Sequence, residues 1–483
     1  MPLILPGNVA SATAATYSID NSCRFNDDDA AYMQWTPTDS AGTDGQIYTL
    51  SFWLKRGSLG AGSQTIFSYA TPQSQIQFES DVWNAHGFKD GGTTWYETKT
   101  TAKYSDPSAW YHFVTAVDTT QGTEANRVKV YVNGVQITSL TVDYPTQNLN
   151  TLFFTDIIHT IGRYEYGDTN YFDGYLAEFI GIDGTQYAAS DFGEFDSDSP
   201  TIWKPKDPSG LTFGDEGFWL DFEDSSALGN DVSGNDNDWT VTNLAAADQA
   251  TDTPTNNFCT LNPVATTSGL GSELTFSEGN CKIVNTGSGL WEPSIGTIAA
   301  TAGKWYAEFK VTALGGAHMY GIMDPAQYDD TMPLDNPASI SRAYGYSYSN
   351  GHATNDGNSA AWGTSFTTGD IISVAMDLDN MKLYMAKNDA WADSGDPTSG
   401  ATGTGTHDYF GGASNTARAA GTDYYTFMAN IHNSSTNESN FGGCPGFAIA
   451  SGNQDANGYG NFEYAVPSGY YALCTKNLAE FGG

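Results

Sequence analysis

The alternation of apolar and polar side chains is clearest in one stretch of the first third of the chain. Trp110–Asp118 is a largely apolar run, and in Val128–Val132 the valines fall on one face while Lys and Tyr fall on the other. A period of two is typical of a strand with one buried side. Asn133-Gly134 follows, the dipeptide that best tolerates two consecutive positive φ values, and the alternation resumes at Val135. The pattern predicts a β-hairpin with a further strand before it.

Short apolar or alternating segments bounded by turn-forming residues recur along the whole chain. In the first half they are 47–54, 64–69, 74–78, 157–162, 171–180 and 217–222. In the second half they are 303–311, 320–322, 344–348, 369–379 and 382–388. No long stretch has helical periodicity, so we predict an all-β protein built from antiparallel β-sandwiches.

Length and composition add the domain organisation. A chain of 483 residues is too long for one ordinary core, and its 53 glycines and 13% aromatic residues suit many short strands joined by turns. We expect an N-terminal arm at 1–20, a first jelly-roll sandwich with a C-terminal extension at 21–248, and a second sandwich at 249–483. The small, polar composition of the arm is typical of a segment that lies on a neighbour or frays.

The charge excludes one class of partner. Lys and Arg number 19 and Asp and Glu 56, a net charge of −37, so nucleic acid is excluded as the main ligand and an anionic membrane surface is disfavoured. The N-terminus has no basic region and only a short apolar run between prolines, so we expect no secretory signal and no membrane insertion. The five cysteines are widely spaced without a CxxC pair, which indicates free thiols.

Five segments resemble the laminin-G-like, concanavalin A-like lectin family, in the order in which that family has them. They are Ser51-Phe-Trp-Leu, Trp110-Tyr-His-Phe-Val, Val130-Tyr-Val-Asn-Gly, Ile161-Gly-Arg and Phe172-Asp-Gly-Tyr-Leu-Ala-Glu-Phe. The resemblance covers roughly residues 20 to 185 and implies a jelly roll there. Gly303-Lys-Trp-Tyr-Ala-Glu-Phe, Tyr344-Gly-Tyr-Ser-Tyr and the run 369–388 resemble the SPRY β-sandwich, over about 300 to 478.

Between the two domains, the runs 228–238, 253–258 and 261–263 resemble a linker found in structural proteins of tailed bacteriophages. This resemblance implies a virion protein that is assembled in the host cytoplasm and contacts other virion proteins. Because virion appendages are commonly symmetric, we expect a homo-oligomer and take a trimer as the working hypothesis.

Aromatic residues that we expect in loops, beside Gly, Asn or Asp, are the candidates for ligand binding. A ring face can stack on a sugar while neighbouring amides and carboxylates bind its hydroxyls. The candidate carbohydrate-binding residues are Trp83, Trp95, Tyr96, Tyr164, Tyr166 and Trp362. The alternative is that about half of such residues belong to the core, as we expect for Trp53, Trp110 and Trp305 within strands.

Two acidic turns are candidates for calcium, the one cofactor that the sequence suggests. Asp27 and Asp29 lie in an Asn-Asp-Asp-Asp run, and Asp231 and Asn235 lie in a run of alternating oxygen-bearing side chains around a glycine. Such runs can wrap Ca²⁺, although the second lacks the distal Glu of an EF-hand. Turn formation alone is the alternative explanation for both runs.

No enzyme signature is present. Glu194-Phe-Asp-Ser-Asp198 approaches the Glu-x-Asp-x-Glu strand of concanavalin-type glucanases, but its third acid is Asp and no strand formers follow. The histidines show no HxH or HExxH spacing. We therefore expect a non-enzymatic virion protein, a tail fibre or receptor-binding component that recognises host surface polysaccharide. The alternatives are a capsid-decorating or head-fibre protein and a polysaccharide-degrading tailspike.

Overall fold

A computed structural model describes most of the chain. The described residues are 2–6, 17–38, 44–60, 62–69, 74–88, 95–265, 273–287, 289, 291–328, 342–407, 410 and 423–483. Contacts group the chain into two compact units: Ala14–Thr255 form one, and Met1–Thr13 together with Asn256–Gly483 form the other. We call them the N-terminal and C-terminal units. Both are built almost wholly of antiparallel strands, which confirms the predicted fold class.

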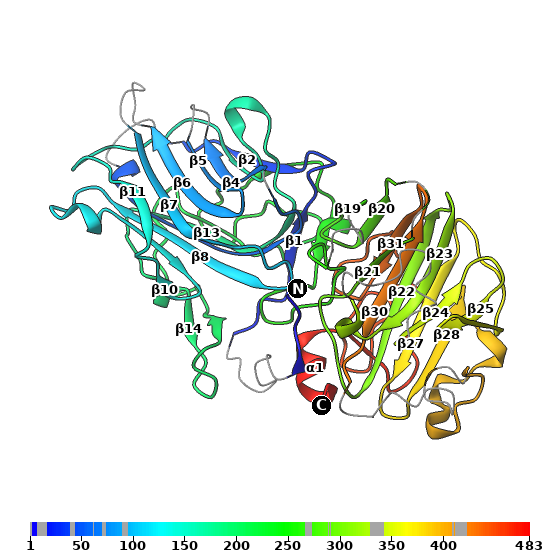
Figure 1. Cartoon of the computed structure of the whole chain (residues 1–483). Helices are drawn as coiled ribbons and strands as arrows, with labels where there is room; N and C mark the ends of the chain where they lie inside the picture. The colour runs from blue at the N-terminus through cyan, green and yellow to red at the C-terminus, as the bar shows by residue number, and fades with distance from the viewer. Residues whose placement is uncertain are drawn as a thin grey trace. The chain divides into compact units, whose positions relative to one another are not determined.

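Two sheets make the N-terminal unit (Figure 1). The first, the β3 sheet, has the order β10-β9-β8-β3-β13-β1-β18, and β16 also pairs with β13. Its strands are β1 (Ser22–Phe25), β3 (Ile47–Arg56), β8 (Trp110–Asp118), β9 (Val128–Val132), β10 (Val135–Gln136), β13 (Gly174–Asp183), β16 (Phe218–Leu220) and β18 (Gln249–Ala250). The predicted hairpin is confirmed: Val132 pairs with Val135 across a turn in which Asn133 has φ 47° and Gly134 φ 79°.

The second sheet, the β6 sheet, has the order β11-β7-β6-β5-β4-β12-β2-β17. Its strands are β2 (Tyr32–Trp35), β4 (Ser63–Tyr69), β5 (Gln75–Glu79), β6 (Val82–Phe88), β7 (Trp95–Lys103), β11 (Leu140–Asp143), β12 (His159–Ile161) and β17 (Thr240–Thr242). The side chains that alternate toward the β3 sheet are apolar or aromatic, so the two sheets share one core.

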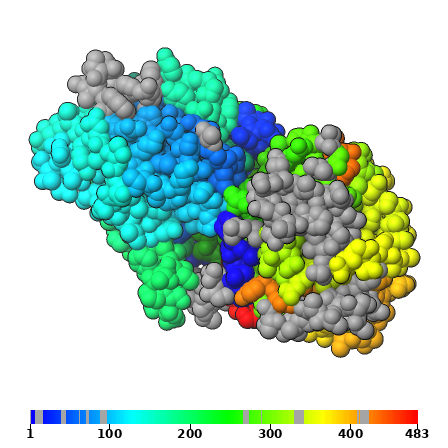
Figure 2. All heavy atoms as spheres, viewed as in Figure 1, coloured from blue at the N-terminus to red at the C-terminus, as the bar shows by residue number. Residues whose placement is uncertain are grey.

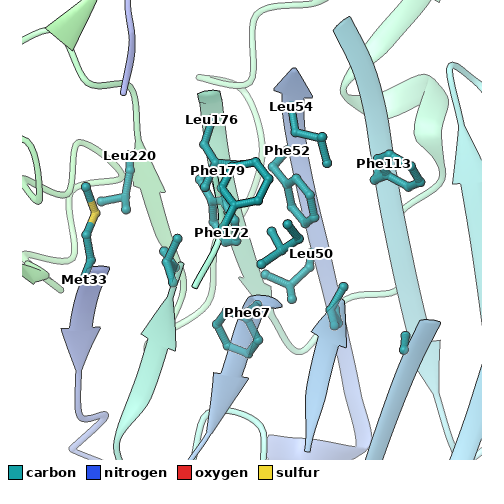
Figure 3. Close-up of a cluster of buried hydrophobic side chains, with 14 of the residues drawn as sticks. Met33, Leu50, Phe52, Leu54, Phe67, Phe113, Phe172, Leu176, Phe179 and Leu220 are labelled. Carbon is teal, nitrogen blue, oxygen red and sulfur yellow. The ribbon is translucent and has the colours of Figure 1, made fainter. Parts of the chain in front are cut away.

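Aromatic side chains dominate this core. Figure 3 shows Phe52 and Phe179 from the β3 sheet facing Phe67 from the β6 sheet. The rings of Phe52 and Phe179 are stacked at a centroid distance of 4.7 Å. Leu50, Leu54 and Leu176 fill the space around them, all fully buried. Alternation along each strand therefore puts one side of each sheet in the core and leaves the other side free for other contacts.

The segment after β13 belongs to the N-terminal unit, where it adds strands to both sheets. Strands β16, β17 and β18 pair with β13, β2 and β1, which confirms the strand predicted at 217–222. β14 (Gly193–Phe195) and β15 (Trp203–Pro205) form a separate hairpin. Asp252 holds the end of the segment against β3 and β8. Its Oδ2 lies 2.7 Å from the buried Lys55 Nζ, and Trp110 Nε1 donates to its Oδ1 at 3.0 Å.

The C-terminal unit is a second sandwich. One sheet has the order β19-β20-β31-β22-β27-β28-β29, with β32 parallel to β22, and the other has the order β21-β30-β23-β24-β25-β26. The strands are β19 (Leu274–Ser277), β20 (Lys282–Asn285), β21 (Trp291–Ile295), β22 (Lys304–Ala313), β23 (Ala317–Met323), β24 (Ala343–Ser347), β25 (His352–Asn355), β26 (Asn358–Ala361), β27 (Ile371–Asp377), β28 (Lys382–Lys387), β29 (Ala390–Trp391), β30 (Thr426–His432), β31 (Thr436–Asn440) and β32 (Tyr471–Ala472). A short helix, α1 (Thr475–Phe481), follows β32.

The segment predicted as an N-terminal arm is shared between the two units. Ile4 bridges to Ile298 of the C-terminal unit, where Ile4 N donates to Thr297 O at 2.9 Å. Tyr17 lies in the N-terminal unit, where its hydroxyl donates to Glu178. All five cysteines are buried. Within the described parts of the chain, no helix has the length and apolar character needed to cross a membrane.

Candidate functional site

The outer side of the β6 sheet is a polar surface, which we call the polar face. On β5, Ile76 and Phe78 belong to the core, so Gln75, Gln77 and Glu79 project to the opposite side. The same alternation applies to the neighbouring strands. The polar face comprises Gln34, Thr65, Ser68, Gln75, Gln77, Glu79, Asn84, His86, Glu97, Lys99 and Thr160.

Strand register arranges these side chains in two rows. The first row is Lys99, Asn84, Gln77 and Thr65, each directly opposite the next. The second row is Glu97, His86, Gln75, Ser68, Thr160 and Gln34. Directly opposed side chains on one face have Cβ atoms about 4.5–5.5 Å apart. The fold thus brings polar residues scattered between positions 34 and 160 into a continuous array of amide, hydroxyl and carboxylate groups.

Hydrogen bonds fix several members of the array. Asn84 Nδ2 donates to Glu97 Oε1 at 3.0 Å and to Glu79 Oε2 at 3.4 Å, and Lys99 Nζ donates to the same Glu79 oxygen at 2.6 Å. The hydrogen bond from Lys99 lowers the pKa of Glu79, and burial lowers the pKa of His86. At neutral pH, therefore, Glu79 is ionised and the His86 imidazole is neutral.

Two amide oxygens of the polar face have no hydrogen-bond partner among the residues that the structure describes. They are Gln77 Oε1 and Asn84 Oδ1. Gln77 is 6% exposed and Asn84 only 2%. Buried polar atoms in native proteins are almost always satisfied by the protein, by water or by a ligand. These oxygens therefore indicate a place where the face is completed by donors from outside the chain.

The loop after β12 borders the polar face. Ser68 Oγ donates to Arg163 O and accepts from Glu165 N, both at 2.9 Å. The Arg163 guanidinium lies 3.6 Å from the centroid of the Tyr32 ring and pairs with Glu165 at 2.6 Å. In Figure 2 the turquoise atoms of this loop lie beside the blue atoms of the β6 sheet. The ion pair and the ring contact hold the loop against the sheet.

Two of the predicted carbohydrate-binding residues lie on this loop. Tyr166 is 62% exposed, and its ring centroid lies 6.3 Å from that of the half-buried Tyr164. The structure therefore brings Tyr164 and Tyr166 to the border of the polar face. Their binding role stays a prediction, but their position fits it.

The structure corrects the prediction that Trp83 and Tyr96 bind carbohydrate, because neither residue lies in an exposed loop as expected. Trp83 is on β6 and fully buried, stacked on Phe113 at 4.3 Å. Tyr96, on β7, is 5% exposed, and its hydroxyl lies 2.7 Å from the hydroxyl of Tyr48. Neither ring offers a face to a ligand. The strand period that turns these two rings into the core turns Asn84 and His86 to the opposite side of the sheet, and the sequence reasoning missed these two residues.

The two remaining aromatic candidates are apart from this group. Trp95 begins β7, and its side chain lies outside the described residues. Trp362 lies in the C-terminal unit and is 9% exposed, and its Nε1 donates to Gly405 O at 2.8 Å. It lines a small cavity with Tyr344, His407 and Phe410. Trp362 lies in the loop after β26, as expected, but its ring is buried and offers no exposed face to a ligand.

The acidic turn at Asp231 is accounted for without calcium. Its Oδ1 accepts from Trp219 N at 2.8 Å and Ser233 N at 2.9 Å, and its Oδ2 accepts from Ser233 Oγ and Asn237 N. Asn235 Nδ2 donates to two glycine carbonyls, Gly214 O and Gly217 O. Both oxygens of the Asp231 carboxylate thus accept hydrogen bonds from protein donors, and the Asn235 amide donates to backbone carbonyls. The prediction of Asp231 and Asn235 as calcium ligands is therefore not supported.

The other predicted calcium turn has a similar local explanation. Asn26 Nδ2 donates to Asp29 Oδ2 at 2.9 Å, and Ala30 N donates to Asp27 O at 3.1 Å. Asp27 and Asp29 are exposed. Among the residues that the structure describes, no three His, Cys, Asp or Glu side chains are grouped as metal ligands. Calcium binding by Asp27 and Asp29 stays a prediction without structural support.

The acidic run at Glu194 does not form a catalytic pair on a sheet face. Glu194 lies on the short β14–β15 hairpin, and Lys204 Nζ is 3.5 Å from Glu194 Oε1 and 3.4 Å from Asp196 Oδ2. Asp196 Oδ1 also accepts from the backbone of Asp198 and Ser199. The arrangement is that of a surface turn in which one lysine pairs with two carboxylates.

A Ser–His pair on the outer side of the β3 sheet has the wrong polarity for nucleophilic catalysis. Trp203 Nε1 lies 3.0 Å from His112 Nδ1, and His112 Nε2 lies 2.9 Å from Ser51 Oγ. Because an indole N–H can only donate, Nδ1 must carry the lone pair, and Nε2–H then donates to Ser51. Burial lowers the pKa of His112 to about 3. A general base must instead accept the serine proton, so His112 cannot activate Ser51 in this arrangement.

Comparison with known proteins finds a family similarity over part of the chain. Residues 27–180 match the family model described as the concanavalin A-like lectin/glucanases superfamily. A search of curated proteins finds no match.

Three solved structures illustrate the structural similarity. A putative carbohydrate binding protein from Bacteroides ovatus is 14% identical with a TM-score of 0.31, and the match covers 47% of this chain and 59% of that chain. The SPRY domain of human HERC1 is 14% identical with a TM-score of 0.27, covering 37% and 96%. A heptameric SAP-like pentraxin from Limulus polyphemus is 15% identical with a TM-score of 0.26, covering 36% and 80%.

At these TM-scores the three similarities carry no conclusion about fold or function, and the SPRY resemblance of the C-terminal unit stays a prediction. The family match agrees with the two-sheet architecture and with the order of the five sequence segments. Residues 27–180 are therefore similar in sequence to the concanavalin A-like lectin/glucanases superfamily.

Proposed function

We propose that this protein is a non-enzymatic glycan-binding protein whose N-terminal unit binds sugar on the polar face of the β6 sheet. The observation that carries the proposal is the array of opposed amide, hydroxyl and carboxylate side chains with two unsatisfied amide oxygens. Sugars present many hydroxyls in fixed directions, and such an array can bind several of them at once. Tyr164 and Tyr166 at the border supply ring faces for stacking.

The biological setting that we propose is a bacteriophage tail fibre or receptor-binding component that recognises host surface polysaccharide. It rests on the resemblance of the segment between 228 and 263 to the linker of phage structural proteins. In that setting the partners are other virion proteins and copies of this chain. Labelled protein that binds stripped capsids and fails to stain host cells would place it on the head instead.

Binding at the border of the polar face can be tested with Tyr166→Ala. We expect the variant to bind immobilised host exopolysaccharide about five- to tenfold more weakly, through loss of one aromatic stacking contact. Phe195→Ala is the matched control, because Phe195 is an aromatic residue 43% exposed on the β14–β15 hairpin. Equal losses in both variants, or a wild-type protein that does not bind, would overturn the proposal. Release of reducing ends from the polysaccharide would overturn its non-enzymatic part.

A further inference from the structure

Asn84 has an amide whose orientation the surrounding charges determine. Its Nδ2 faces two carboxylates, Glu97 and Glu79, at 3.0 and 3.4 Å. A flipped amide would place Oδ1 against both carboxylates, which is electrostatically unfavourable. Oδ1 is therefore the atom without a partner, and it is a pure acceptor.

A second acceptor lies directly across the strand pair. Gln77 is the register partner of Asn84, and its Oε1 is also without a partner. The two residues are 6% and 2% exposed. A single ligand that presents two neighbouring hydrogen-bond donors would satisfy both oxygens at once.

The ion pair between Lys99 and Glu79 spans the strand that carries Asn84. Glu79 is on β5 and Lys99 on β7, the two neighbours of β6, and their charged atoms are 2.6 Å apart. The side chains are 33% and 45% exposed, for Lys99 and Glu79. Pairs this accessible to solvent are weak. The Lys99–Glu79 ion pair therefore lies over the Asn84 amide, and a ligand that breaks this ion pair loses little binding free energy.

The charge around the two acceptors is negative. Glu79 and Glu97 both contact the Asn84 amide, and Lys99 is the one cation of the described polar-face residues bonded to either of them. An anionic ligand group placed here would be repelled by these carboxylates. Its oxygens are hydrogen-bond acceptors, so they could not bond to the two amide oxygens, which also only accept. A hydroxyl-rich neutral group meets neither obstacle.

We propose that Gln77 and Asn84 form a subsite that accepts hydrogen bonds from adjacent hydroxyls of a neutral sugar, and that it makes the polar face select neutral glycans over uronic acid-containing ones. This inference rests on the proposed glycan-binding function and specifies its ligand class. Lys99 and Glu79 separate to admit the sugar, while Glu97 keeps the Asn84 amide oriented.

The test measures binding of the full chain to neutral oligosaccharides and to uronic acid oligosaccharides on one array, followed by affinity measurements on the strongest binders. We expect the strongest binding to neutral sugars and about a tenfold loss in Asn84→Leu, from removal of a buried acceptor. Gln136→Leu is the control, because Gln136 is an exposed amide on β10 of the other sheet. Preference for uronic acids, or unchanged affinity in Asn84→Leu, overturns this inference and leaves the proposed function standing. Absence of any binding by the wild type overturns both.

If Asn84→Leu does not fold, the variant Lys99→Met provides a second test of the neutral-sugar subsite. Lys99→Met removes the cover and a positive charge without altering either acceptor. We expect it to raise the ratio of neutral to uronic acid affinity by about threefold or more at low salt, because uronic acids lose their one local cation. A ratio that stays the same or falls overturns the inference.

Discussion

Glu178 is a carboxylate that the fold buries at a break in the register of two central strands. The pairing of β13 with β3 shifts between Ala177 and Ile180, and Glu178 adopts φ 47° in the interruption. Its Oε1 accepts a hydrogen bond from the Tyr17 hydroxyl at 2.7 Å. Burial raises the pKa of Glu178 to about 8, although the bond from Tyr17 acts in the opposite direction. The protonated form is thus the stable one in the folded protein at neutral pH.

This pKa predicts how stability depends on pH. Between the ordinary pKa of Glu, near 4.5, and the folded value of about 8, the folded state binds the proton and the unfolded state does not. The free energy of unfolding therefore falls as the pH rises through this window. Glu178→Gln mimics the protonated form, so its advantage over the wild type should grow from near zero at pH 4.5 to on the order of 5 kcal/mol at pH 8.5.

Urea unfolding of both proteins at several pH values measures that advantage. Glu124→Gln serves as the control, because Glu124 is exposed on a surface turn. A difference between wild type and Glu178→Gln that does not change with pH would show that Glu178 ionises normally in the folded state.

Single residues also mark where sequence reasoning succeeded and failed at the site. Trp83 and Tyr96 were assigned to loops because small or polar residues flank them, whereas both alternate with polar residues along a strand. The period of two in Trp83-Asn-Ala-His86 and in 75–79 is present in the sequence and could have indicated a polar outer side. The opposition of Asn84 to Gln77 and to Lys99 could not be predicted, because long-range register depends on how the whole sheet assembles.

At the level of elements, strands with a strong local signal were predictable and short ones were not. The hairpin at Val128–Gln136 has alternation and a specific turn dipeptide, and it forms as expected. Strands β17 and β18 have three and two residues, too few for a period to show. They exist because β2 and β1 offer sheet edges for them to pair with. Tertiary pairing, rather than local propensity, determines such strands.

The hairpin turn contains a glycine that is needed for two separate reasons. Gly134 has φ 79°, and a Cβ on it would lie 2.3 Å from the Trp203 ring of the neighbouring β15 strand. Gly184 has φ 78° but no atom within 4 Å of such a Cβ. Gly134→Ala should therefore cost the backbone strain plus a steric clash, roughly 3 kcal/mol in total, while Gly184→Ala should cost about 1 kcal/mol.

Denaturant unfolding of the two alanine variants separates strain from packing. Trp203→Leu combined with Gly134→Ala should recover part of the loss, because the smaller side chain leaves room for the methyl group. Equal destabilisation by Gly134→Ala and Gly184→Ala would mean that β15 does not pack on the turn.

At the scale of the whole molecule, the large negative net charge can be read directly from the sequence, and ion pairs in the folded protein do not offset it. The charge of −37 is spread over both units, and only 19 Lys and Arg residues are present to pair with 56 Asp and Glu residues. The ion pairs among the described residues engage a minority of these acids. Self-repulsion then destabilises the compact state, and dissolved salt screens it.

Raising NaCl from 10 to 300 mM should therefore raise the melting temperature, by roughly 2–4 °C for each kcal/mol of relieved repulsion.

CaCl₂ at the same ionic strength should produce a similar rise, because the Asp231 carboxylate is already occupied by protein donors. Differential scanning calorimetry with NaCl, CaCl₂ and EDTA distinguishes screening from specific binding. A ligand that binds only the native state stabilises it in proportion to the logarithm of its concentration over Kd. A rise at micromolar Ca²⁺ that EDTA reverses would accordingly restore a calcium site, with Asp27 and Asp29 the first residues to replace.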